Sequence, residues 1–234
     1  MATLYIVATP IGNLEDLTYR AARMLGQVGI LACEDTRTTR KILARYTIPH
    51  PEKLLAYHEH NEAQAAAGIV KLLDEGRNVA LCSEAGYPGI SDPGYRVITA
   101  ALAAGHRLEV IPGAGAVEPA LVASGLPTAT FTFKGFPPRR PGPRRRFFAS
   151  DREPTHTLVL YESPHRLAAC LRDALDVLGD RRAALCIELT KKFEEVHRGW
   201  LKDLAERFAT QPVRGEVTIV IAGNHPKFIR SDEP

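Results

Sequence analysis

Short apolar runs alternate with longer amphipathic segments through the first half of the chain. Near-continuous hydrophobic runs, typical of strands buried on both faces, occur at 4–8, 30–33, 54–57, 79–82 and 108–111. Predicted helices end near Gly26 and Tyr46, span 62–75 and 95–104, and begin again near Ala116. This alternation predicts a parallel, doubly wound sheet with right-handed crossovers and helices on both faces.

The second half has a different pattern. After Ser124-Gly125-Leu126-Pro127, strands are predicted at 131–136, 157–161, 184–189, 196–198 and 216–221, with helices at 164–178 and 201–208. The smaller share of helix favours a second α/β domain with a mixed, partly antiparallel sheet. We therefore predict an N-terminal domain at 1–127, a C-terminal domain at 128–224 and a loose tail at 225–234.

Glycine-rich loops follow two of the predicted strands, at 83–94 and 112–116. Neither has the lysine and Ser/Thr of a phosphate-binding P-loop, and neither opens the first strand–helix unit as a dinucleotide fingerprint does. Ser91 or Asp92 is the expected N-cap of the helix after the first loop. Loops of this kind, at the carboxyl ends of parallel strands, favour a small ligand that the backbone approaches closely.

Composition indicates the general class of protein but not its function. Apolar content of 45%, charged content of 24% and a net charge of +3 are ordinary for a globular protein. No apolar run is long enough to span a bilayer, and the N-terminus lacks a signal layout, so we expect a cytoplasmic protein without a membrane partner. The four cysteines have no CxxC spacing and are expected to be reduced core residues.

Positive charge is concentrated at 134–152, where Asp151 is the only acidic residue. The prolines at 137, 138, 141 and 143 predict an extended arm. Such an arm fits a segment that follows RNA phosphates, and a solubilising loop is the alternative interpretation. The candidate RNA contacts are Arg139, Arg140, Arg144, Arg145 and Arg146.

A resemblance is carried by the stretches at 9–14 (TPIGNL), 34–37 (EDTR), 86–94 (GYPGISDPG), 111–117 (IPGAGAV), 161–166 (YESPHR) and 188–191 (ELTK). Together, from about residue 4 to residue 222, the chain resembles the tetrapyrrole methylase superfamily. Within it, the match is to enzymes that methylate the ribose 2′-hydroxyl of a cytidine in small-subunit ribosomal RNA. The resemblance implies two α/β domains, S-adenosylmethionine in the cleft between them, and a homodimer.

The resemblance also implies which residues contact the cofactor. They are Pro10, Gly86, Tyr87, Ile90, Asp92, Gly115 and Ala116, with Tyr161 and Glu162 from the second domain. The family usually has Asp at position 84, Thr at 87 and Ser at 115, whereas this chain has Glu84, Tyr87 and Gly115. If backbone groups bind the cofactor, these differences are tolerable. If the family's Thr and Ser hydroxyls bind it, this chain should bind the cofactor more weakly or in an altered pose.

Methyl transfer to a hydroxyl needs alignment of the reacting atoms and removal of a proton. Glu34, Asp35 and Glu188 are the candidate bases, because each is predicted at a strand end. Arg37 and Lys191 are candidates for holding phosphates or stabilising the developing alkoxide. The alternatives are a helix N-cap for the Glu34-Asp35 pair and solvated surface for Lys191.

Other interpretations stay open at this point. His58 and His60 share a face if they lie on a strand, but no further ligand set accompanies them, so no metal is predicted. A methyltransferase acting on a small tetrapyrrole would not need the arginines at 139–146. An RNA-binding assembly factor with a vestigial cofactor pocket would fit the changes at positions 84, 87 and 115.

Overall fold

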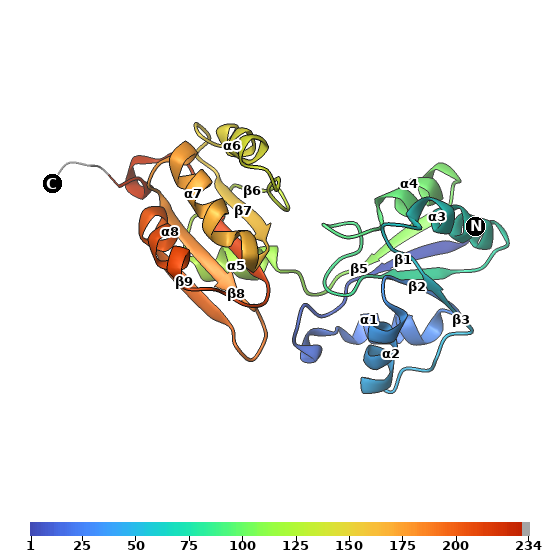
Figure 1. Ribbon diagram of the computed structural model, residues 1–234. Coiled ribbons are helices and arrows are strands. Elements are labelled where there is room, and N and C mark those ends of the chain that lie inside the picture. The colour runs from blue at the N-terminus through green and yellow to red at the C-terminus, as the bar shows by residue number, and fades with distance from the viewer. Residues whose placement is uncertain (231–234) are drawn as a thin grey trace. The chain divides into compact units, whose positions relative to one another are not determined.

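A computed structural model describes residues 1–230. The chain forms two compact units, which divide between Gly115 and Ala116 (Figure 1). The division is earlier than the predicted boundary after residue 127. Helix α5 (Val117–Ser124) packs on strands β8 (Arg182–Ile187) and β10 (Val217–Ile221) of the second unit. In that packing the Cys186 thiol lies 3.7 Å from the Ala120 carbonyl oxygen.

The first unit contains a five-stranded, fully parallel sheet in the order β3-β2-β4-β1-β5. Its strands are β1 (Thr3–Val7), β2 (Ile30–Cys33), β3 (Lys53–Ala56), β4 (Val79–Cys82) and β5 (Arg107–Ile111). Its helices are η1 (Leu14–Asp16), α1 (Tyr19–Gln27), α2 (Thr36–Arg45), α3 (Glu62–Asp74) and α4 (Tyr95–Ala103). This confirms the predicted parallel α/β sheet.

Helices cover both faces of this sheet, α1 and α2 on one side and α3 and α4 on the other (Figure 1). Successive strand residues point to opposite faces, so Ile6 of β1 joins the core under α3 and α4, and Val7 joins the core under α1 and α2. Cys33 and Cys82 lie opposite each other on β2 and β4. All four cysteines are buried and have free thiols.

The second unit has a mixed sheet, which confirms the prediction from the sequence. Its strand order is β6-β7-β10-β8-β9. Its strands are β6 (Phe131–Phe133), β7 (Thr157–Glu162), β8 (Arg182–Ile187), β9 (Glu195–Trp200) and β10 (Val217–Ile221). Besides α5, its helices are α6 (Pro141–Ala149), η2 (Pro164–Arg166), α7 (Leu167–Leu178), α8 (Leu201–Thr210) and η3 (Pro226–Phe228). Phe148 of α6 is fully buried in this unit's core.

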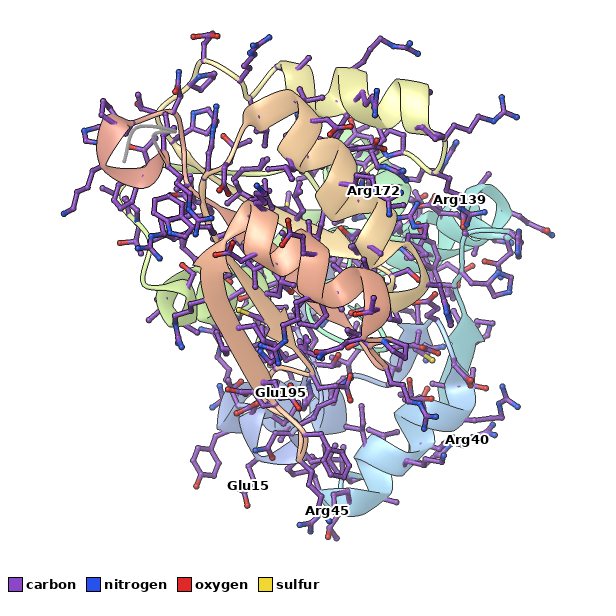
Figure 2. The ribbon with its side chains drawn as sticks, turned by 60° about the vertical axis from the view of Figure 1, so that its left-hand side comes forward. Glu15, Arg40, Arg45, Arg139, Arg172 and Glu195 are labelled. Atoms are coloured by element: carbon purple, nitrogen blue, oxygen red, sulfur yellow. The ribbon has the colours of Figure 1, made fainter. Side chains whose placement is uncertain are left out.

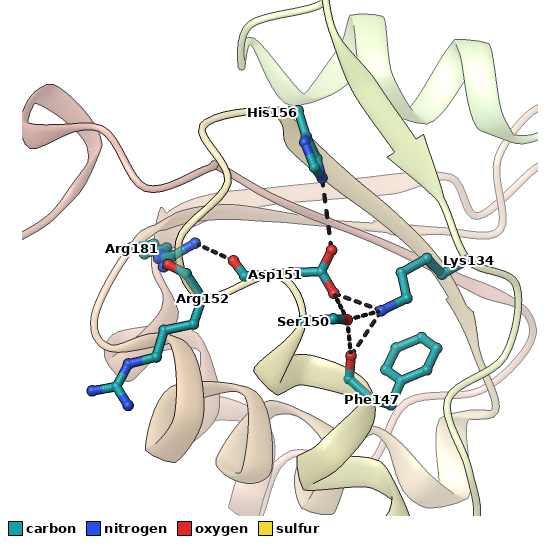
Figure 3. A network of polar contacts seen from close by, with 7 residues as sticks. All are labelled: Lys134, Phe147, Ser150, Asp151, Arg152, His156 and Arg181. Carbon is teal, nitrogen blue, oxygen red and sulfur yellow. Dashed lines mark hydrogen bonds and ion pairs between the residues drawn. The ribbon is translucent and has the colours of Figure 1, made fainter.

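A polar network fixes the end of α6 to the sheet (Figure 3). The Lys134 ammonium, just after β6, donates to the Asp151 carboxylate at 2.6 Å and to the Phe147 carbonyl oxygen at 2.7 Å. The Arg181 guanidinium donates to the Asp151 carbonyl oxygen at 3.1 Å. Lys134 and Asp151, at the two ends of the basic segment, therefore have structural roles.

Residues 225–230 are not the loose tail that the sequence predicts. The Arg230 guanidinium lies 5.0 Å from the Trp200 ring centre and forms an ion pair with Asp203 at 2.7 Å. The Arg230 backbone N–H also donates to the Asp180 carbonyl oxygen at 2.9 Å. The rest of the predicted tail, 231–234, lies outside the described residues.

The loop at 83–94 ends in a way that the sequence did not indicate. The N-cap of α4 is Gly94, not Ser91 or Asp92. Glycine has no side chain that could accept a hydrogen bond from the first turn of the helix. Instead, the Glu62 carboxylate of α3 accepts from the Gly94 N–H at 3.1 Å and from the Tyr57 hydroxyl at 3.0 Å. A Cβ at Gly94 would lie 2.6 Å from the Gly89 nitrogen, so only glycine permits this approach.

Replacing this capping carboxylate tests its contribution. Although burial acts to raise the Glu62 pKa, hydrogen bonds from Gly94 and Tyr57 and the Arg96 charge hold it below its ordinary value. We expect Glu62→Gln to lower the free energy of unfolding at pH 7 by about 1.5–3 kcal/mol, the range for hydrogen bonds to charged groups.

The pH dependence follows from the lowered pKa. The contribution of the carboxylate is complete above the unfolded-state glutamate pKa, about 4.3, and is lost as the pH falls through the lower folded-state value. Urea denaturation at several pH values measures this, with the exposed Glu59→Gln as control. Equal losses for Glu62→Gln at pH 7 and in acid would contradict the capping role.

Candidate functional site

The candidate site in the first unit lies at the carboxyl edge of its parallel sheet. Because all strands run the same way, the loops after β1, β2, β4 and β5 meet at this edge. Thr9 and Gly86 join two of these loops by a pair of backbone hydrogen bonds of 2.9 and 3.0 Å. Pro10, buried, follows Thr9 directly, so the predicted cofactor residues Pro10 and Gly86 lie on paired loops.

Tyr87 ties the β4 loop to the β5 loop. Its hydroxyl accepts from the Gly113 N–H at 3.0 Å and lies 3.4 Å from the Gly113 carbonyl oxygen. A Cβ at Gly113 would come within 3.0 Å of the Ala8 Cβ, so this loop also passes close to the end of β1. The tyrosine that departs from the family pattern therefore has a structural task, which a threonine is too short to perform.

The other cofactor candidates of the first unit lie on the same loops. Gly86 has a φ of +79°, a left-handed conformation that favours glycine. Ile90 is half exposed in the same loop as Asp92, and Gly115 follows the β5 strand end. The edge thus combines exposed apolar surface with closely approached backbone, as the sequence predicts for a small ligand.

Glu34 is the candidate base whose ionisation is most suited to accepting a proton. Burial raises its pKa above the ordinary glutamate value, and the nearby charge of Glu84 raises it further. His58 lowers it, while Asp35 and Glu59 add smaller increases. A raised pKa makes a carboxylate a stronger base near neutral pH. The sequence indicated Glu34 but not its coupling to Glu84 and His58.

Asp35 is the N-cap of α2, which was the alternative interpretation from the sequence. Its carboxylate accepts from the Arg37 N–H at 2.6 Å and pairs with the Arg37 guanidinium at 3.0 Å. These hydrogen bonds hold the Asp35 pKa below its ordinary value. A weaker base engaged in capping is a poorer proton acceptor than Glu34.

In the second unit, Glu188 and Lys191 form a network with Glu216. The Lys191 ammonium donates to Glu188 at 2.8 Å and to Glu216 at 2.9 Å. The hydrogen bond from Lys191 is the main cause of the lowered Glu188 pKa. Burial acts against the charge of Lys191, but its hydrogen bonds to Glu188 and Glu216 raise its pKa overall. Glu188 is therefore firmly ionised, and Lys191 is not the unpartnered surface residue of the alternative interpretation.

Backbone strain marks the same loop. Glu188 and Thr190 have φ values of +52° and +66°, which non-glycine residues rarely adopt. Strain of this kind concentrates at functional sites. The antiparallel register pairs Val217 with both Glu162 and Ile187, so the ends of β7 and β8 lie at one edge of this sheet.

The predicted cofactor residues of the second unit are placed as follows. Tyr161 packs edge-on against Phe133 and Phe136, with ring centres 4.8 and 5.6 Å apart. Glu162 is buried and holds Arg166 in an ion pair. Ala116 precedes α5. Their contact with a cofactor stays a prediction.

The prediction of an extended basic arm is wrong. Residues 141–149 form α6, because Pro141 and Pro143 stand in its first turn, where proline favours a helix start. Arg144 is buried and pairs with Asp173 of α7 at 2.7 Å. It is therefore a structural residue, and its assignment as an RNA contact is withdrawn.

The other arginines of this segment differ in whether they form ion pairs. Arg145 is exposed but pairs with Asp173 at 3.0 Å and with Asp176 at 2.5 Å. Within residues 1–230, the exposed side chains of Arg139, Arg140 and Arg146 form no ion pair. Asp173 was missed in the sequence although a signal existed: it lies among the inward-facing positions of α7 beside Cys170 and Ala174.

His58 and His60 pack edge-on, with ring centres 6.1 Å apart. In the described part of the chain no group of three or more His, Cys, Asp or Glu side chains is arranged to hold a metal ion. Among residues 1–230, no helix has the length and hydrophobicity needed to cross a bilayer.

Comparison with solved structures shows the fold first. The fold resembles the crystal structure of the methyltransferase CobJ, with a TM-score of 0.72, 16% identity and coverage of 96% of this chain and 95% of that one. It also resembles a uroporphyrin-III C-methyltransferase of Thermus thermophilus complexed with S-adenosyl homocysteine, with a TM-score of 0.64, 22% identity and coverage of 95% and 97%.

Sequence comparison then identifies the family. Residues 3–205 match the model of the tetrapyrrole (corrin/porphyrin) methylases. The chain belongs to this family. Proteins named "ribosomal RNA small subunit methyltransferase I" are 46% identical in Halalkalibacterium halodurans and 40% identical in Thermotoga maritima. The matches cover 96% and 95% of this chain and 77% and 99% of those proteins.

The buried Arg144–Asp173 pair gives a direct test of the corrected assignment. Asp173→Ala leaves a guanidinium buried without its partner, and we expect a loss of about 3–5 kcal/mol in the free energy of unfolding. The control is Asp176→Ala, which breaks an exposed pair and should cost at most about 1 kcal/mol. Chemical denaturation of both variants measures this. Similar losses for the two would restore Arg144 as a solvent-facing residue.

Proposed function

We propose that this protein methylates the ribose 2′-hydroxyl of a cytidine in small-subunit ribosomal RNA, with S-adenosylmethionine as the methyl donor. The observation that carries the proposal is identity of 40–46% over nearly the whole chain to proteins named for methylation of that RNA. The ribose hydroxyl as acceptor rests on the resemblance that the six stretches carry together.

The carboxyl edge of the first unit fits the donor. The paired Thr9 and Gly86 backbones, the tether from Tyr87 to Gly113 and the half-exposed Ile90 offer close backbone approach and apolar surface. S-adenosylmethionine, when bound, supplies an electrophilic methyl group on a sulfonium that is neutralised by the transfer. The loops at 83–94 and 112–116 contain no Lys or Arg, which suits this cofactor because its sulfonium is itself positive.

In this proposal Glu34 accepts the hydroxyl proton. Its carboxylate lies at the end of β2, on the same sheet edge as the cofactor loops, and burial with the Glu84 charge raises its pKa. Glu188 and Lys191 of the second unit are joined by a hydrogen bond. We assign the Lys191 ammonium to an RNA phosphate or to the developing alkoxide. Arg37 of α2 is assigned to RNA phosphate.

The proposal includes a homodimer in the cytoplasm. The free, buried thiols suit a reducing compartment, where disulfides are rare. The homodimer rests on the resemblance, and sedimentation equilibrium of the purified full chain tests it.

The activity is tested with methyl-labelled S-adenosylmethionine and small ribosomal subunits that lack the modification. We expect label in the ribosomal RNA, at a cytidine whose ribose resists alkaline cleavage because its 2′-hydroxyl is blocked. Label transferred only to a uroporphyrinogen-type tetrapyrrole would establish the small-molecule alternative. No heat of S-adenosylmethionine binding in calorimetry would establish the non-catalytic alternative.

The role of Glu34 predicts both a rate and a pH profile. Glu34→Gln should lower kcat by about 10²–10⁴-fold, the usual contribution of general base catalysis. In the unmodified protein kcat rises with pH as Glu34 loses its proton. Because the Glu84 charge raises the Glu34 pKa, Glu84→Gln should shift this rise to lower pH.

The control for the pH profile is Glu75→Gln, an exposed carboxylate outside the group that acts on Glu34. It should leave the profile unchanged. A Glu34→Gln variant with full kcat would remove this residue from the reaction. An unshifted profile in Glu84→Gln would assign the rise to another group.

A further inference from the structure

Helix α2 has one strongly basic side. We define its basic face as the exposed side chains of Arg37, Arg40, Lys41 and Arg45. At 100° per residue these positions fall within one side of the helix, opposite the buried Thr39, Ile42 and Leu43. Figure 2 shows Arg40 and Arg45 projecting away from the ribbon of α2.

Little of this charge is used inside the protein. Arg37 pairs with the capping Asp35, an exposed contact. In the described chain, residues 1–230, the side chains of Arg40, Lys41 and Arg45 form no ion pair. Burial of Ile42 and Leu43 already secures the helix on the sheet, so the fold does not need these cations.

The charge of the first unit is also unequal between the two faces of its sheet. Helix α1 shares a face with α2 and adds Arg20 and Arg23, and neither helix contains an acidic residue. The acidic residues near this face are Glu15 and Asp16 of η1, which act electrostatically on Tyr46 at the end of α2. The helices on the opposite face carry both signs, with Glu62, Lys71 and Asp74 on α3 and Arg96 on α4.

The position of α2 connects this charge to the candidate site. The helix begins two residues after Glu34, at the carboxyl edge of β2. Its length of about 15 Å carries the basic face from that edge back along the face of the sheet. A polyanion bound along α2 is therefore led to the loop that contains Glu34.

We infer that the basic face of α2 binds the phosphate backbone of the RNA substrate and brings its ribose to the Glu34 loop. The inference rests on the proposed function and deepens it by locating a substrate-binding surface that the candidates at 139–146 do not include. Arginine and lysine side chains hold phosphates without reading sequence, so this surface positions the RNA and leaves the choice of nucleotide to other contacts.

The test neutralises three positions together, Arg40→Gln, Lys41→Gln and Arg45→Gln, in the full-length protein. The matched control removes the same charge elsewhere in the first unit, with Lys53→Gln, Lys71→Gln and Arg77→Gln. Binding to small-subunit ribosomal RNA is measured at several salt concentrations, together with KM for that RNA, kcat, and calorimetric binding of S-adenosylmethionine.

We expect the α2 variant to bind RNA at least about tenfold more weakly near physiological salt. Its plot of log K against log salt should flatten by about 2, since each single-strand phosphate contact contributes about 0.7. KM for RNA should rise by a similar factor. S-adenosylmethionine binding should stay as in the unmodified protein, and so should kcat at saturating RNA when it is measured at a pH above the Glu34-dependent rise. The control variant should behave like the unmodified protein.

The outcomes separate this inference from the proposed function. Failure of the unmodified protein to methylate RNA refutes the proposed function itself. A methylating protein whose α2 variant matches the control refutes only the basic face. An α2 variant that binds free RNA normally but loses affinity for assembled small subunits also overturns the inference, because the surface then contacts a ribosomal protein.

Discussion

The backbone pairing of Thr9 with Gly86 holds the candidate site together. It joins the loop after β1 to the loop after β4, which are neighbouring strands of the parallel sheet. Tyr87 then extends the connection to Gly113 after β5, and Glu62 secures the far end of the β4 loop through Gly94. The loops are thus fixed by hydrogen bonds to backbone groups, while Gly89 and Ile90 of the β4 loop stay exposed.

Charged side chains in this protein divide into those that complete the fold and those that stay available. Arg144 and Asp173 join α6 to α7, and Lys134 with Asp151 anchors the end of α6. Breaking any such pair leaves a charge without compensation in a poorly solvated place, so these residues cannot be exchanged freely. The exposed cations of α2 have no such constraint, and their presence is better explained by a partner than by stability.

The sequence predicted the elements well because periodicity reports burial directly. The strands of the first unit are continuous apolar runs, and the parallel sheet follows from them. It failed where long-range contacts decide the local structure. No local pattern shows that Glu62 replaces Asp92 in capping α4, or that Asp173 draws Arg144 into the interior. The prolines at 141 and 143 were misread because proline both opens helices and extends chains, and the buried Phe148 decides between the two.

In the proposed complex with RNA, the candidate base and the basic face of α2 act on the same charges. A bound RNA brings negative charge toward Glu34, and negative charge raises a carboxyl pKa, as Glu84 already does. Unopposed, this would raise the Glu34 pKa further when the substrate arrives. Cations on the helix that starts beside Glu34 neutralise the incoming phosphates. The cations then act against the rise in the Glu34 pKa that the bound phosphates would cause.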